Sequence, residues 1–142
     1  MREIKFRAWE KNLKEIIPVY NIDFEKRMIN IDFAWRTFDE VELIQFTGLY
    51  DKHHKPIYEG DIVKGFYDEY NLYFNETNRI EFISDVKRIN NGFGVRRLTA
   101  NYEGRLRDYG YQLFWDAEKV EVIGNIYENK HLLEGAFEWV TY

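Results

Sequence analysis

The sequence contains no cysteine, two prolines and a single serine in 142 residues. The lack of cysteine excludes a disulfide framework, a cysteine-ligated zinc or iron–sulfur site, and a thiol nucleophile. Ser84, the only serine, lies in a strand-like pattern and has no Gly-x-Ser-x-Gly elbow around it. No apolar run approaches the roughly 18 residues needed to cross a bilayer. We therefore expect a soluble, cytoplasmic protein without a membrane partner and without residues for covalent catalysis.

Charge is unevenly distributed along the chain. The net charge is −5, but the segment 87–107 holds six basic residues and one acid, a net charge of +5 that leaves −10 elsewhere. The net charge therefore argues mildly against a general coat for nucleic acid, while a local anion site or pairing between copies stays open. The simpler interpretation is a solvated strand face. The candidate anion or nucleic-acid contacts are Lys87, Arg88, Arg96, Arg97, Arg105 and Arg107.

Aromatic residues are abundant, with 11 Tyr, 11 Phe and 4 Trp, or 18% of the chain. Such side chains suit half-buried sheet surfaces, so packing between strands accounts for most of them. Tyr and Trp also anchor interfaces, because they bury an apolar ring and keep a polar group. A self-association surface is therefore a reasonable second use.

Alternating apolar residues predict many short strands. The pattern places them at 3–9, 16–24, 28–33, 41–46, 57–64, 79–86, 93–101, 111–115 and 119–123. Gly65 to Asn78 has no clean period, which indicates an irregular excursion. Asn129 as N-cap and Gly135 after the last turn predict a short helix over 130–134. The pair Gly60-Asp61 ahead of a β-branched run is typical of a strand start in SH3-like barrels.

These elements predict an α+β fold that is predominantly β. We expect antiparallel hairpins with an SH3-like small-barrel element and a short C-terminal helix. No linker, repeat or low-complexity tract is evident in the sequence, so one domain is expected over 1–142.

Three stretches carry a family resemblance: MREIKFRAWE at the start, LIQFTGLYDKHHKPIYEGDIV in the middle and VIGNIYENKHLLE near the end. In this order and spacing they resemble the YopX family of bacteriophage and prophage proteins. The resemblance spans 1 to about 134, with a variable middle at about 65–118, and the tail 136–142 lies beyond it. The motif residues to which we assign structural roles are Trp9, Phe46, Gly48, Gly60, Asp61, Gly124, Asn125 and Tyr127.

The resemblance implies a phage or prophage origin, a location in the bacterial host cytoplasm, and a homo-oligomer. The family has no established activity, so no catalytic residue carries over. His53-His54 departs from the pattern, because relatives tend to have Asn-Gly there, and a different turn is expected. Lys130 stands where a proline often opens the last helix.

The remaining polar patterns give little chemistry. Adjacent His53 and His54 would point to opposite sides of an extended chain, which is poor geometry for sharing a metal ion. Glu59 and Asp61 would share a face as an acid–base pair, yet a turn role explains Asp61 more simply. We expect no cofactor, no metal and no enzyme activity.

Our leading hypothesis is a non-enzymatic phage accessory protein that self-assembles and contacts phage or host proteins. The alternative is a small β-barrel that binds nucleic acid through the basic segment 87–107, with Tyr102 or Tyr109 stacking on bases. An enzyme comes third.

Overall fold

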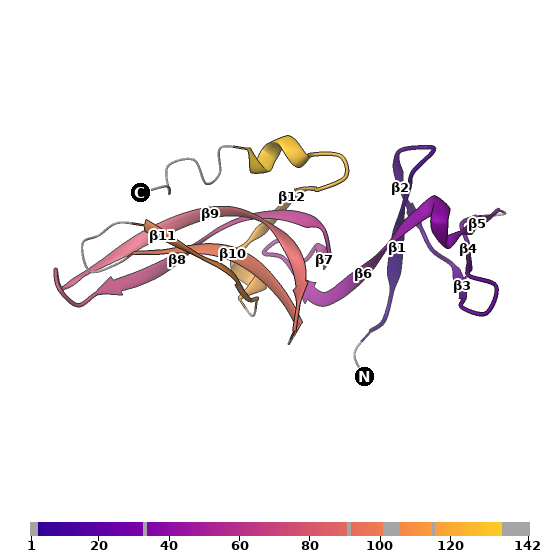
Figure 1. The fold of residues 1–142 in the computed structure, drawn as a ribbon. Helices are drawn as coiled ribbons and strands as arrows, with labels where there is room; N and C mark the ends of the chain where they lie inside the picture. Colours follow the sequence, from indigo (N-terminus) through magenta and orange to yellow (C-terminus); the bar gives the residue numbers. More distant parts are fainter. Residues whose placement is uncertain (1–2, 33, 91, 101–105, 115, 135–142) are drawn as a thin grey trace. The chain divides into compact units, whose positions relative to one another are not determined.

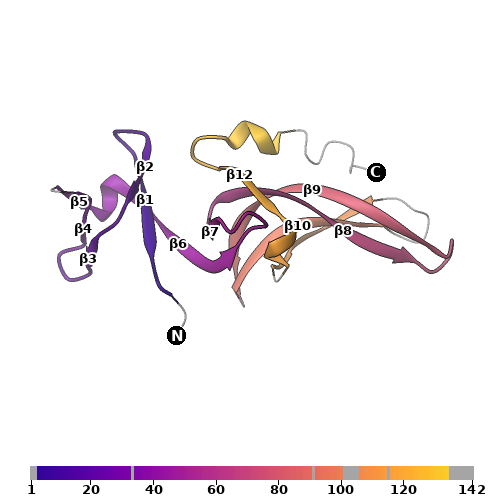
Figure 2. The same ribbon diagram turned by 180° about the vertical axis from the view of Figure 1, so that it is seen from behind.

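The fold was analysed in a computed structural model that describes residues 3–32, 34–90, 92–100, 106–114 and 116–134. The chain divides into two compact units, Met1–Gly48 and Leu49–Tyr142. Both are built from antiparallel strands (Figures 1 and 2). The predicted predominance of β structure is confirmed. The single domain over 1–142 stays a prediction, because two compact units do not settle whether each folds alone.

The first unit contains two small groups of strands. The elements are β1 (Phe6–Glu10), β2 (Glu15–Pro18), β3 (Asn21–Asp23), β4 (Met28–Asn30), β5 (Trp35–Thr37), the 3-10 helix η1 (Phe38–Glu40) and β6 (Val41–Tyr50). One sheet has the order β3-β4-β5, and β2-β1-β6 belong to the other. β1/β2 and β3/β4 are antiparallel hairpins, and the predicted strand 16–24 is divided between them as β2 and β3. Pro18 ends the edge strand β2, which suits a residue without an amide hydrogen.

The core of the first unit is small. Ala8, Ile29, Ile31 and Val41 are buried, and half-buried apolar side chains pack around them. Removing this apolar surface from water favours the folded state at about 25 cal/mol per Å². Ile4 was expected on the same strand face as Ala8, but it lies before β1 and is exposed.

The second unit is one curled, half-barrel sheet of five strands in the order β11-β10-β9-β8-β12 (Figure 1). β7, which belongs to the sheet of β6, precedes it. The elements are β7 (Pro56–Tyr58), β8 (Asp61–Asn71), β9 (Glu76–Ile89), β10 (Gly92–Ala100), β11 (Leu106–Leu113), β12 (Glu121–Asn125) and the 3-10 helices η2 (Ala117–Lys119) and η3 (Lys130–Leu133).

Alternation along β8, β9 and β10 builds the core of the second unit. Val63, Phe82, Val86 and Val95 are buried, together with Ile57, Phe114, Ala117 and Val120. Because successive residues of a strand face opposite sides of the sheet, the residues between them lie on the outer face. The outer face therefore carries the charged side chains that the next subsection describes.

The predicted excursion from Gly65 to Asn78 is wrong. This segment forms most of β8, a four-residue turn and the start of β9, with a continuous register from Ile62↔Asp85 to Asn71↔Glu76. Around the turn both faces are exposed to water. Because both faces of the hairpin contact solvent there, its folding does not require apolar and polar side chains to alternate.

The predicted C-terminal helix is present only as one 3-10 turn, η3. Asn129 is its N-cap residue but makes no side-chain capping bond there. The α component of the predicted class is therefore not confirmed. Gly135 and the tail 136–142 lie outside the described residues. Across the described part of the chain, no helix has the length and apolar character to cross a membrane.

Candidate functional site

Asp51 organises the turn in the middle motif. Its Oδ1 accepts hydrogen bonds from the backbone N–H of His53 (2.9 Å) and Lys55 (2.8 Å), and its Oδ2 accepts one from Val122 (3.0 Å). Burial alone would raise the pKa of this carboxyl, but the three N–H donors and the nearby His53 together lower it. The sequence placed Asp51 in a polar turn without finding its link to β12.

The turn after Asp51 adapts to the missing glycine. His54 adopts a left-handed backbone with φ of 62°, a conformation that glycine or asparagine takes more readily. Its ring stacks on Tyr50 with ring centroids 4.6 Å apart. The two histidines therefore belong to a turn.

A second motif, Gly124 to Asn129, folds into a turn held by side-chain amides. Asn125 Oδ1 accepts from the backbone N–H of Tyr127 (3.0 Å) and Glu128 (2.8 Å). Asn129 Oδ1 in turn accepts from the Asn125 N–H at 3.1 Å. A Cβ on Gly124 would lie 2.6 Å from Asn129 Oδ1, so only glycine fits there.

The Gly60-Asp61 pair has the turn role that the sequence suggests. Gly60 has φ of +86°, and its N–H and C=O bond to Val86 and Ile126. Asp61 is buried, and its Oδ2 accepts from the Tyr58 N–H at 2.8 Å. The middle and C-terminal motifs therefore meet at Gly60.

An open hollow of about 360 Å³ lies at this junction, with Glu59, Arg88 and Tyr127 in its lining. Burial raises the pKa of the Glu59 carboxyl, and the positive charge of Arg88 partly opposes that shift. Asp61 is engaged in its own turn, so the two do not form an acid–base pair.

We expect Glu59→Gln to stabilise the protein slightly at neutral pH. A carboxyl with a raised pKa disfavours the folded state once it ionises, so the penalty appears as the pH rises through the folded pKa. The expected gain in Tm is about 2 °C at neutral pH, and it vanishes below the ordinary pKa of 4.5. Thermal unfolding followed by circular dichroism measures both, with the exposed Glu118→Gln as control. A lower Tm at neutral pH would contradict the expectation.

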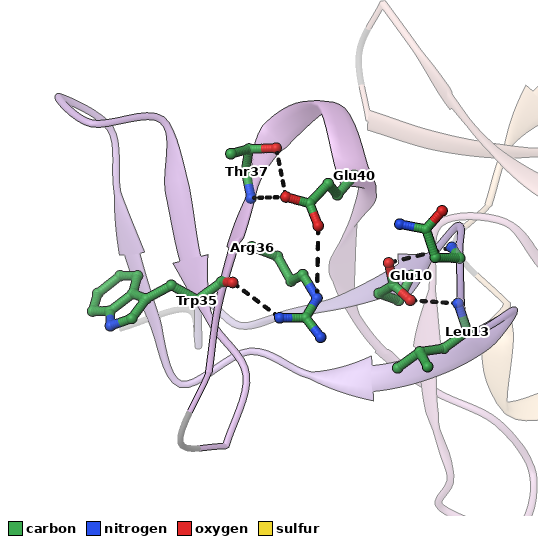
Figure 3. Close-up of polar contacts among 7 residues, drawn as sticks. Glu10, Leu13, Trp35, Arg36, Thr37 and Glu40 are labelled. Carbon is green, nitrogen blue, oxygen red and sulfur yellow. Dashed lines mark hydrogen bonds and ion pairs between the residues drawn. The ribbon is translucent and has the colours of Figure 1, made fainter.

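The first unit holds a group of polar side chains between β5 and η1 (Figure 3). Glu40 Oε1 accepts from the Thr37 N–H (3.3 Å) and the Thr37 hydroxyl (3.1 Å), and its Oε2 lies 3.7 Å from Arg36 Nε. Arg36 Nη1 donates to the backbone oxygen of Trp35 at 3.0 Å. These contacts are local, and they fix the turn that leads into β6.

Glu10 is the one fully buried charged residue in the described first unit. Its carboxylate accepts from the backbone N–H groups of Asn12 (3.2 Å) and Leu13, which closes the β1–β2 turn (Figure 3). The sequence predicted only that Glu10 belongs to a polar turn. Nothing in the local pattern distinguishes a buried carboxylate from a solvated one.

The structure separates the six predicted basic contacts. Lys87 follows buried Val86 and Arg96 follows buried Val95, so both lie on the outer face of the sheet. Arg88 is paired with Phe93, which packs on the core, and therefore lies on the other side, near Glu59. The backbone of Arg97 lies in β10 and that of Arg107 in β11, and their side chains are outside the described part of the structure. The same holds for the side chain of Tyr109 and for the whole of Tyr102 and Arg105.

Lys87 and Arg96 define what we name the basic face. Arg96 is paired with Tyr111 on β11, and Lys87 Nζ lies 5.3 Å from the centre of the Tyr111 ring. The Tyr111 hydroxyl donates to the Asp85 carboxylate, which lies on the same face. The face thus places Lys87 beside the Tyr111 ring and Arg96 opposite Tyr111 on the neighbouring strand, and the nearby Asp85 carboxylate is already hydrogen-bonded.

The sequence did not identify the other conspicuous surface, the end of the β8–β9 hairpin. We name residues 68–79 the arm; its turn lies at the far end of the sheet from β7 and β12 in both views (Figures 1 and 2). Leu72 and Tyr73 are 81% and 76% exposed, and Tyr70 and Phe74 are also exposed. Exposed apolar side chains gathered at one point mark interaction surfaces more often than those scattered singly.

The described residues offer little for catalysis. No group of three or more His, Asp or Glu side chains in the described ranges is close enough to hold a metal ion. Ser84 is buried, and its Oγ accepts from the Arg96 N–H (2.8 Å) and donates to the Asp85 carbonyl (2.8 Å). The serine thus holds β9 and β10 together just beyond their last backbone pair, Val86↔Val95.

Comparison with known proteins gives a family and a fold. The family model described as YopX protein matches residues 5–134, which covers parts of both units. A crystal structure of protein EF1440 from Enterococcus faecalis is similar with a TM-score of 0.60 and 23% identity, over 94% of this chain and 100% of that one. No curated protein matches the chain. The likeness at this identity concerns the fold alone.

Proposed function

This chain belongs to the YopX family, and from that membership we propose a phage- or prophage-encoded accessory protein that acts by self-association and protein contact rather than catalysis. The proposal includes a place in the cytoplasm of the bacterial host and a phage or host protein as a further partner. It also includes an SH3-like small barrel, which the half-barrel curl of the five-stranded sheet supports.

The observation that carries the proposal is the arm. Leu72, Tyr73 and Phe74 are exposed at the turn, although burying such side chains typically stabilises a protein by about 1.5–3 kcal/mol each. In the described part of the chain, the neighbouring strands pair with the base of the hairpin, β12 with 61–64 and β10 with 86–89. A projecting hairpin with an apolar end is suited to contact another protein surface.

We expect the wild-type protein to be oligomeric at about 50 µM and Leu72→Ser to weaken association about tenfold. Leu72 is 81% exposed, so its loss should leave the Tm of the dilute, dissociated protein unchanged. Sedimentation velocity over a concentration series measures the association. The control is Leu13→Ser, the same substitution at a 54% exposed position in the first unit. A wild-type monomer at every concentration would end the self-association proposal.

Nucleic-acid binding is the second candidate function. The observation in its favour is the basic face, where Lys87 lies near the Tyr111 ring and Arg96 is the strand partner of Tyr111. Phosphate contacts would make binding strongly salt-dependent. Fluorescence anisotropy with labelled single- and double-stranded DNA and RNA at low salt tests it, and loss of binding in Arg96→Glu/Arg97→Glu would support it.

A further inference from the structure

The arm and the basic face have opposite charge and complementary chemistry. We propose that the arm of one copy docks on the basic face of a second copy. The inference rests on the proposed self-association and names the two surfaces that meet.

The arm combines apolar and acidic groups. Residues 68–79 contain three acids and one arginine, a net charge of −2: Asp68, Glu69 and Glu76 against Arg79. Arg79 Nε already lies 3.2 Å from Asp68 Oδ1, and the Arg79 guanidinium covers the Phe66 ring at 4.0 Å. The internal pair therefore neutralises one acid, and Glu76 stands exposed beside the apolar turn.

The basic face offers what this arm needs. Cations bind the faces of aromatic rings as well as carboxylates, and this chain uses that contact at Lys5–Phe46 (4.4 Å) and Arg27–Phe38 (5.3 Å). Lys87 and Arg96 could therefore meet both the acids and the rings of the arm. Asp85, the acid two residues from Lys87 on this face, is engaged by the Tyr111 hydroxyl.

A single copy cannot make this contact with itself. Glu76 and Lys87 lie near opposite ends of the same strand, β9. Eleven residues of extended chain separate them by about 35 Å along the strand. The continuous β8–β9 register holds the hairpin extended, so Glu76 can meet Lys87 only in a second copy. A twofold pair or a head-to-tail ring would each use both surfaces.

The charge of the arm favours a protein as its partner over a membrane surface or a nucleic acid. A loop that inserts into a bilayer surface is normally flanked by basic residues, which attract anionic headgroups. In the arm, acidic residues flank the apolar turn, and these acids would repel the phosphates of nucleic acid. The partner surface must therefore be basic, and the basic face with Lys87 and Arg96 supplies one.

The test is a charge reversal followed by mixing. Glu76→Lys reverses the arm and Lys87→Glu reverses the basic face, both at exposed positions. Each variant alone should associate about tenfold more weakly than wild type in sedimentation velocity. In an equimolar mixture, the reversed arm of one variant meets the reversed face of the other, and their two wild-type surfaces also match. The mixture should recover wild-type association.

The control replaces Lys87→Glu with Lys130→Glu, the same charge change at an exposed lysine of η3. Mixed with Glu76→Lys, it should give no recovery. Thermal unfolding of every variant checks that the fold is intact.

The outcomes separate this inference from the proposed function. If Leu72→Ser weakens association while Lys87→Glu does not, self-association stands and the basic face is the wrong partner surface. If both reversals weaken association but the mixture does not recover, direct pairing is also wrong. Binding of the arm to anionic vesicles, or loss of only oligonucleotide binding in Lys87→Glu, would equally overturn it. A monomeric wild type would remove the proposed function together with the inference.

Discussion

Asp51→Ala should lower the free energy of unfolding by about 3 kcal/mol or more. The substitution leaves the N–H groups of His53, Lys55 and Val122 without their acceptor in a site where the side chain is only 5% exposed. Each buried donor left unsatisfied costs about 1–3 kcal/mol, and water reaching the vacated space reduces the total. Because one of the three bonds leads to β12, the damage extends beyond the turn to an edge of the five-stranded sheet.

Urea unfolding followed by circular dichroism measures this loss. Asp51→Asn should fall between wild type and Asp51→Ala, because its amide oxygen still accepts from the turn while its NH₂ group faces the Val122 N–H. The control Lys52→Ala removes an exposed ion pair with Glu121 (3.6 Å) and should cost less than about 0.5 kcal/mol. A loss below about 1 kcal/mol in Asp51→Ala would mean that the carboxylate does not hold the turn.

Acid should narrow the difference between wild type and Asp51→Ala. The folded-state pKa of Asp51 is lowered, so its contribution is fully present above the ordinary pKa of 3.8 and is lost as the pH falls through the folded pKa. The difference in unfolding free energy should therefore stay constant near neutral pH and narrow only below that value. A difference that narrows above it would contradict the lowered pKa.

Gly124→Ala should cost about 2–3 kcal/mol through a steric clash. The new methyl would lie 2.6, 2.8 and 2.9 Å from Oδ1, Cγ and Cβ of Asn129. Asn129 must then move, and its bond from the Asn125 N–H is lost. The loss is again measured by urea unfolding.

A double variant tests the mechanism of this loss. Asn129→Gly removes all three atoms that the methyl would meet, at the cost of the same hydrogen bond. Gly124→Ala/Asn129→Gly should therefore be less destabilised than the sum of the two single variants by about 1 kcal/mol. Simple additivity would show that the clash is relieved elsewhere or does not occur.

The sequence predicted the strands best where one face is buried. The alternation around Ala8, Ile29 and Phe82 coincides with β1, β4 and β9, because a half-buried strand must separate apolar from polar side chains. From Asp68 to Asn78 that requirement is absent, so the sequence pattern does not predict the hairpin. Its stability comes from pairing with the rest of β8 and β9.

The candidate site was less predictable than the fold. The run of basic residues was visible, but sequence proximity could not show that Lys87 and Arg88 face opposite sides of β9. Most of the arm lies in Gly65 to Asn78, which the sequence predicted as irregular. Asp51 and Glu10 look like ordinary surface acids, because their partners are backbone N–H groups that no sequence pattern specifies.

The pairing of β8 with β12 has a consequence for synthesis on the ribosome. The hairpins β8–β9, β9–β10 and β10–β11 join neighbouring strands, so each is able to form soon after its second strand emerges. β12 pairs with β8 at Glu121↔Lys64, across 57 residues of chain. Until β12 emerges, the edge of β8 at Asp61–Lys64 is open to other nascent chains, and a message truncated before Glu121 would yield a product prone to aggregate.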